Sequence, residues 1–170
     1  PLLVKYDLQA LSQAVRKEDL RARPADLWRY REFLPVRNPL NIVSLGEVMT
    51  PLISLPRLSV GQGALLVKDE GRLPTGSFKA RGLCMAVSMA KELGLSRIAM
   101  PTNGNAGAAL AAYASRAQIE SYVFCPADTP EINVREIAAQ GAKVWRVNGL
   151  INDCGRLVGE GKQAMNWFDL

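Results

Sequence analysis

The spacing of apolar residues changes along the chain and divides it into two parts. From residue 64 onward, short apolar runs alternate with longer amphipathic stretches. Short apolar runs between turns are typical of buried strands, and apolar residues that recur every three or four positions indicate helices. The pattern predicts strands at 64–68, 97–101, 119–124 and 143–147, and helices at 77–94, 104–117, 131–140 and 151–166.

This alternation of strands and helices predicts an α/β fold, in which βαβ units form a parallel sheet with flanking helices. The front part of the chain is different. It predicts two short amphipathic helices, at 7–17 and 25–33. Residues 35–63 are rich in Pro, Gly, Asn and Ser and indicate a long loop with brief extended pieces.

Composition and charge narrow the classes of function. The chain has 170 residues, of which 48% are hydrophobic and 22% charged, an ordinary globular mixture. A net charge of +5 suits an anionic ligand, but the basic residues are scattered, so we do not expect nucleic acid as a partner. No apolar run approaches membrane-spanning length, so we expect no membrane segment.

The residue types that are missing exclude further chemistry. The chain has no histidine, which rules out Ser-His or Cys-His catalysis and a His-based metal site within it. We expect no metal. Cys84, Cys125 and Cys154 are far apart and form no CxxC pair. Such dispersed cysteines favour reduced thiols in a cytoplasmic protein over a disulfide framework.

The most informative motif is the run Pro-Thr-Gly-Ser-Phe-Lys-Ala-Arg-Gly at residues 74–82. It indicates a turn followed by a helix, with Lys79 in the first helical turn. The helix dipole disfavours a cation there and favours a neutral amine, which can attack a carbonyl group. The alternative is a solvated surface lysine. Arg81 either holds the turn through carbonyl oxygens or meets an anion, and the sequence leaves both open.

A second motif follows the strand predicted at 97–101. Residues 101–107, Pro-Thr-Asn-Gly-Asn-Ala-Gly, form a Gly- and Asn-rich turn that opens the next helix. In α/β proteins ligands bind at this end of a parallel strand, and the exposed N–H groups suit a carboxylate or a phosphate. The amides of Asn103 and Asn105 add donors and acceptors. The alternative is an ordinary turn with a helix cap.

Taken together, the two motifs resemble the fold-type-II pyridoxal-phosphate (PLP) enzymes, and within them the threonine synthases. The resemblance runs the length of the chain. Its strongest pieces are residues 68–70, 74–82 and 102–107, and the other similar segments are residues 6–8, 28–32, 45–47, 50–52, 149–153 and 167–169. It implies a three-layer fold of the tryptophan synthase β type, with helices flanking a parallel or mixed sheet.

The resemblance also assigns roles to residues. It implies that Lys79 forms the Schiff base with PLP and later moves protons between substrate carbons. Ser77 and Phe78 would shape the floor of the site, and Ser77 would also contact substrate. Asn105 would hydrogen-bond the phenolic oxygen of the cofactor. The substrate carboxylate would be bound by the loop at 102–106, which consists of Thr102, Asn103, Gly104, Asn105 and Ala106.

The implied reaction converts O-phosphohomoserine and water to L-threonine and phosphate, which makes the expected partner an amino-acid phosphate. Three positions depart from the threonine synthase pattern, namely Val48, Ala80 and Ala106. They leave open a threonine or serine dehydratase-like lyase. A non-catalytic ligand-binding protein on the same fold is the alternative from another class.

The resemblance also predicts how the chain is organised. We expect an N-terminal fragment, in which residues 1–96 are the leading part of the large PLP-binding domain and residues 97–170 most of the small substrate-binding domain. The loop that grips the cofactor phosphate and the partner of the pyridine nitrogen would belong to an absent C-terminal half, because Gly61-Gln62-Gly63 comes too early and indicates a hairpin or loop. Alone, the chain should bind PLP poorly, and the complete protein is expected to be a cytoplasmic homodimer.

Overall fold

A four-stranded parallel sheet forms the centre of the second half of the chain. The computed structural model describes residues 5–59, 61 and 63–170. The strand order is β5-β4-β3-β6, and every neighbouring pair is parallel. The strands are β3 (Arg97–Pro101), β4 (Glu120–Pro126), β5 (Lys143–Val147) and β6 (Phe168–Asp169). The predicted α/β class and parallel sheet are confirmed, while β6, only two residues long, was not predicted.

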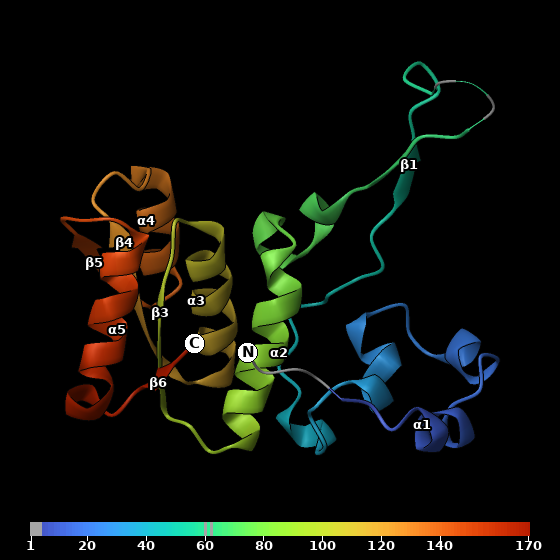
Figure 1. Cartoon of the computed structure of the whole chain (residues 1–170), viewed down its shortest axis with the longest axis horizontal. Helices are drawn as coiled ribbons and strands as arrows, with labels where there is room; N and C mark the ends of the chain where they lie inside the picture. Colours follow the sequence, from blue (N-terminus) through green and yellow to red (C-terminus); the bar gives the residue numbers. More distant parts are fainter. Residues whose placement is uncertain (1–4, 60, 62) are drawn as a thin grey trace.

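Helices cover both faces of this sheet and make three layers (Figure 1). Helices α3 (Asn105–Ala117) and α4 (Glu131–Ala139) lie on one face, and α5 (Ile151–Met165) lies on the other. Helix α2 (Lys79–Glu92) packs against the outer side of α3. Alternate residues of a strand point to opposite faces, so Ile98 joins the core beneath α3 while Ala99 joins the core beneath α5.

Helix α3 is buried along most of its length because it lies between the sheet and α2. Its buried residues run without a break from Gly107 to Ala114, and most of them are alanines. Small side chains let the sheet and α2 approach it closely from both sides. As a result α2 and α3, whose first turns carry the two sequence motifs, share one apolar core.

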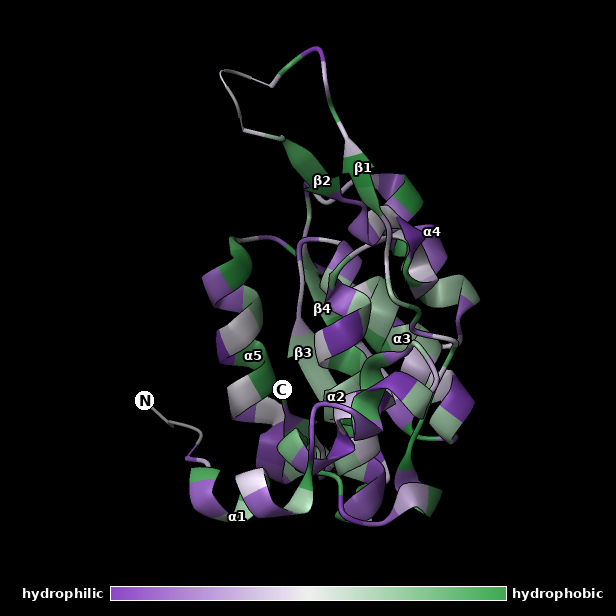
Figure 2. Cartoon of the chain, turned by 90° about the vertical axis from the view of Figure 1, so that its right-hand side faces the viewer, coloured by the Kyte–Doolittle hydropathy of each residue, from purple (hydrophilic) through white to green (hydrophobic). Residues whose placement is uncertain are grey.

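The first predicted strand does not belong to the parallel sheet, which corrects the expected βαβ pattern. Strand β2 (Leu66–Lys68) pairs antiparallel with β1 (Leu52–Ser54) in a separate ribbon. The described residues between these two strands form no helix, and a loop connection permits antiparallel pairing. The ribbon projects from the body (Figures 1 and 2). Its apolar side chains are exposed. The predicted loop at Gly61-Gln62-Gly63 lies partly outside the described residues.

The N-terminal segment is less helical than its pattern predicts. Helix α1 (Leu8–Ala14) ends three residues before the predicted end, because the backbone of Val15 turns extended. The predicted helix at 25–33 is instead the 3-10 helix η2 (Leu27–Phe33), interrupted at Tyr30. The remaining short 3-10 helices are η1 (Asp19–Ala22), η3 (Pro39–Asn41), η4 (Glu70–Arg72) and η5 (Pro74–Gly76).

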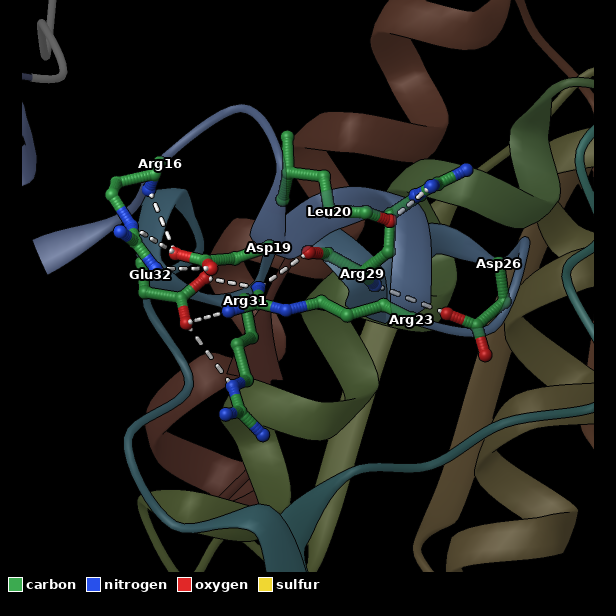
Figure 3. A network of polar contacts seen from close by, with 8 residues as sticks. All are labelled: Arg16, Asp19, Leu20, Arg23, Asp26, Arg29, Arg31 and Glu32. Carbon is green, nitrogen blue, oxygen red and sulfur yellow. Dashed lines mark hydrogen bonds and ion pairs between the residues drawn. The ribbon is translucent and has the colours of Figure 1, made fainter.

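Polar contacts hold the N-terminal segment together (Figure 3). Arg23 donates two hydrogen bonds to the Glu32 carboxylate, at 2.6 and 2.7 Å, and a third to the Arg29 carbonyl oxygen. The hydrogen bonds from Arg23 lower the pKa of Glu32 to about 2. A cavity of about 460 Å³ borders this network. The Arg23 and Arg29 guanidinium groups there contact groups of the segment itself, so we interpret the cluster as structural.

Candidate active site

Lys79 is the first residue of α2, and its predicted place in the first helical turn is confirmed. A strained turn precedes it, since Thr75 has a φ of 62° in η5. A positive φ is unfavourable for a β-branched residue, and such strain persists where the surrounding structure enforces it, often near functional sites. This turn leads directly into α2 and so determines the position of Lys79 at the start of the helix.

The Lys79 side chain is half-buried and available for chemistry. Its Nζ atom lies 4.7 Å from the centroid of the Phe78 ring, which is itself 59% exposed. Within the described part of the chain, Lys79 has neither a hydrogen-bond partner nor an ion-pair partner. Lys91, at the other end of α2, instead donates to the carbonyl oxygen of Leu40. Lys79 is thus the lysine of α2 that has no partner among the described residues and that lines a cleft.

Two buried hydroxyl groups beside Lys79 have no partner among the described residues, namely Thr75 Oγ1 and Ser77 Oγ. Ser77 as a whole is 8% exposed. A buried hydroxyl without a hydrogen bond is costly, so each such group calls for an explanation. A bound polar molecule in contact with this turn would provide one.

Thr102 organises the loop that opens α3. Its hydroxyl oxygen accepts hydrogen bonds from the N–H groups of Gly104, at 3.0 Å, and Gly107, at 2.9 Å. Gly104 has a φ of 146°, which side-chain-bearing residues rarely adopt. Thr102 is 3% exposed, so these hydrogen bonds stabilise the loop from its buried side.

The same loop leaves other N–H groups unused. Among the described residues, the N–H groups of Asn103, Asn105 and Ala106 find no backbone or side-chain acceptor. They lie at the N-terminal end of α3, a helix of 13 residues, where the helix dipole favours an anion. The loop therefore offers donors for a carboxylate or phosphate group.

Lys79 and this loop face the same cleft, of about 420 Å³, at the carboxyl end of β3. The structure thus brings together Lys79 and all five residues predicted at 102–106, while Ser77 and Phe78 lie outside the lining. The lining residues are Lys79, Pro101, Thr102, Asn103, Gly104, Asn105, Ala106, Asn133 and Ile151. Asn133 and Ile151 were not predicted from sequence.

Arg81 supports the lysine turn from behind. It forms a two-pronged ion pair with Glu70, with nitrogen–oxygen distances of 2.6 and 3.0 Å. The Thr50 hydroxyl also donates to Glu70, at 2.5 Å. The hydrogen bonds from Arg81 and Thr50 lower the pKa of Glu70 from 4.5 to about 2. Of the two roles left open for Arg81, the structure shows that it binds an anion, which is the carboxylate of Glu70.

A buried carboxylate links the N-terminal segment to α3. Glu47 is fully buried and accepts hydrogen bonds from the Ser44 hydroxyl at 2.6 Å, from the Leu45 N–H at 2.8 Å and from the Tyr113 hydroxyl. Burial raises the pKa of Glu47, but these hydrogen bonds outweigh it and hold the pKa below its ordinary value. Glu47 lies in the segment predicted as a loop, and that prediction gave no reason to expect its burial.

The donor set fits a cofactor that carries a carbonyl, a phenol and an anionic group. Lys79 offers a free amine for the carbonyl, and Asn105 offers an amide and an N–H group at the mouth of α3. The unpartnered hydroxyls of Thr75 and Ser77 add polar atoms beside the lysine. Across the described ranges, no group of three or more Cys, Asp or Glu residues could hold a metal ion. None of the helices described there is both long and apolar enough to cross a bilayer.

A free lysine that opens one helix, opposite an anion-binding loop that opens the next, defines a site for carbonyl chemistry on an α/β fold. The chain belongs to the pyridoxal-phosphate dependent enzyme family, whose sequence profile matches residues 43–170. The fold and the cofactor of the family thus agree with the resemblance drawn from the motifs.

The chain is similar to proteins named threonine synthase. It is 39% identical over 155 residues to the one from Methanocaldococcus jannaschii, covering 89% of this chain and 38% of that protein. To the one from Halalkalibacterium halodurans it is 42% identical over 125 residues, covering 72% of this chain and 35% of the relative. The chain thus spans little more than a third of each relative's length.

Among solved structures, the chain is similar to Escherichia coli diaminopropionate ammonia lyase in apo form. The TM-score is 0.69 at 22% sequence identity, covering 76% of this chain and 42% of the lyase. At that identity the likeness supports the fold alone.

Proposed function

We propose that the protein carrying this chain is a PLP-dependent lyase of the threonine synthase type, which converts O-phosphohomoserine and water to L-threonine and phosphate. One observation carries the enzyme assignment: the unpaired amine of Lys79 faces the loop at 102–106 across a single cleft. The names of the relatives support the particular reaction. Both substrate and product carry a carboxylate, which suits the N–H groups at the start of α3.

We assign the steps to residues of this chain as follows. Lys79 would hold the cofactor at its carbonyl group, and its amine would move protons between substrate carbons. Asn105 holds the phenolic oxygen of the cofactor, and the unused N–H groups of the loop orient the substrate carboxylate. When bound, PLP supplies an electron sink that stabilises negative charge on the substrate carbons. Thr102 keeps the loop in its binding shape through Gly104 and Gly107.

The organisation of the protein completes the proposal. We assign residues 1–96 to the leading part of the large domain and residues 97–170 to most of the substrate domain. The homodimer and the cytoplasmic location stay predictions. Because this chain spans 38% of the Methanocaldococcus jannaschii relative, we expect further residues to contribute to cofactor binding.

A dehydratase-like lyase is the second candidate, and Ala106 favours it, because many threonine synthases have threonine at this position of the loop. The two reactions release different products. A threonine synthase releases phosphate from O-phosphohomoserine, whereas a dehydratase releases ammonia from L-threonine or L-serine.

The test is to supply the PLP-loaded protein with each substrate and measure phosphate and ammonia. We expect phosphate release that disappears in Lys79→Ala. Ammonia release without phosphate would replace the synthase with the dehydratase. The absence of both products, with ligand affinity unchanged in Lys79→Ala, would leave a binding protein.

A further inference from the structure

Asn133 reaches the anion-binding loop from a different helix. It lies in the first turn of α4, and its side chain rests directly against Gly104. A Cβ atom placed on Gly104 would lie 2.4 Å from Asn133 Nδ2. The absence of a side chain at Gly104 therefore makes room for the Asn133 amide, which lines the same cleft as Lys79.

The side-chain amide of Asn133 forms no hydrogen bond with another described residue. The hydrogen bond that Asn133 makes there is that of its backbone N–H to the Pro130 carbonyl oxygen, and its side chain has no partner in the described part of the chain. The residue is half-buried rather than solvated on the surface. A side-chain amide that is partly desolvated and faces a cleft retains two donors for a ligand.

The charges around Asn133 favour an anion. The cleft lining contains the amides of Asn103, Asn105 and Asn133 and the side chain of Lys79, but no Asp or Glu side chain. Asn133 Nδ2 lies next to the loop whose unused N–H groups also point to an anionic ligand. Two sets of donors from two helices thus converge on one place.

We propose that Asn133 is a substrate-binding residue, whose side-chain amide donates a hydrogen bond to the carboxylate held by the loop at 102–106. The proposal rests on the proposed function, because an amino-acid substrate supplies that carboxylate. It assigns Asn133 to the group that all amino acids share, and not to the phosphate of one substrate.

Asn133→Asp separates binding from packing, because aspartate has nearly the shape of asparagine and keeps the contact with Gly104. It replaces a donor with a negative charge, which repels a carboxylate. Asn166→Asp is the matched control. It makes the same change of charge at the C-terminal end of α5, a helix of 15 residues. The cleft lies at the opposite end of this helix, where Ile151 lines it, so Asn166 is remote from the site.

The experiment measures the affinity of the PLP-loaded protein for L-threonine and for L-threoninol, which has a hydroxymethyl group in place of the carboxylate. We expect Asn133→Asp to weaken L-threonine binding by about tenfold or more, the scale of a lost hydrogen bond to a charged group. Binding of L-threoninol should change by less than about twofold, as should both affinities in Asn166→Asp. Asn133→Ala, which adds no charge, should weaken L-threonine binding less than Asn133→Asp does.

Other outcomes overturn the proposal. If both Asn133 variants bind L-threonine as tightly as the unaltered protein, Asn133 does not bind the carboxylate. Equal weakening for L-threonine and L-threoninol would indicate a packing role instead. These results would leave the proposed function intact, whereas an unaltered protein that binds no amino acid would overturn both.

Discussion

The start of α2 divides this molecule into an N-terminal half, before Lys79, and a C-terminal half, from Lys79 onward. The two halves are stabilised by different forces. In the described part of the N-terminal half, none of the helices α1 and η1 to η5 contains a buried residue. In the C-terminal half, α3 alone buries eight consecutive residues. Apolar burial gains free energy in proportion to area, whereas polar contacts near the surface gain little. We therefore expect the second half to dominate stability, although the lysine turn belongs to the first.

A few buried polar contacts join the two halves. The Val43 N–H donates to Ser88 Oγ at 2.9 Å, and Cys84 Sγ donates to the Val43 carbonyl oxygen at 3.3 Å. Both partners of Val43 lie on α2, while Glu47 reaches Tyr113 on α3. These contacts attach the front segment to the two helices that carry the site. We therefore expect substitutions at these contacts, which we call the joint, to lower the stability of the fold most.

The largest expected effect comes from breaking the joint at Glu47. Glu47→Ala removes the acceptor of three donors, among them the fully buried Tyr113 hydroxyl, so we expect it to lower the free energy of unfolding by about 3–5 kcal/mol. Glu47→Gln keeps one acceptor oxygen and should cost less. Denaturant unfolding of both variants checks this, and a loss below about 1 kcal/mol in Glu47→Ala would show that the joint contributes little.

Close packing in the second half predicts a smaller but clear effect at Gly107. A Cβ atom there would lie 2.6 Å from Thr102 Cγ2 and 2.9 Å from Ile137 Cδ1. We expect Gly107→Ala to destabilise the fold by about 1–3 kcal/mol. The same substitution at Gly155, where the nearest atom is 3.8 Å away, should be neutral or stabilise α5 by about 0.5–1 kcal/mol. Equal melting temperatures for the two variants would contradict this account of packing.

The polar contacts of the first half predict the smallest effect, and it depends on pH. Glu32 and Glu70 both have a folded pKa of about 2, below the ordinary 4.5. Their stabilisation is therefore complete above about pH 4.5 and is lost as the pH falls through 2. We expect Glu32→Gln to cost about 1–2 kcal/mol at pH 7 and much less at pH 2. A cost independent of pH, measured by denaturant unfolding, would contradict the ion-pair explanation.

The sequence predicted the parts of the fold that depend on local pattern. The alternation from residue 97 onward located three strands and three helices within two residues of their observed bounds. Lys79 and the loop at 102–106 were found because turn residues precede a helical pattern, which is a local signal. The pairing of β2 was wrong, since hydrophobic pattern identifies a strand but not its partner.

Residues that act through distant partners could not be found in this way. Glu47 meets Tyr113, which is 66 positions away, and Glu70 meets Arg81 only after the turn at Thr75 has folded. Asn133 sits on an ordinary amphipathic helix, and only the fold brings it against Gly104. Each of these contacts depends on tertiary structure, so the local sequence pattern cannot predict it.

The most direct test of the central claim, that Lys79 binds the cofactor, is visible absorption after addition of PLP. We predict that the complete protein carrying this chain shows a visible band of lysine-bound PLP, which is lost in Lys79→Ala and kept in Lys91→Ala, the control at the other end of α2. Reduction with borohydride should then fix the label on the peptide that contains Lys79. A band that persists in Lys79→Ala, or a label on another lysine, would contradict the account.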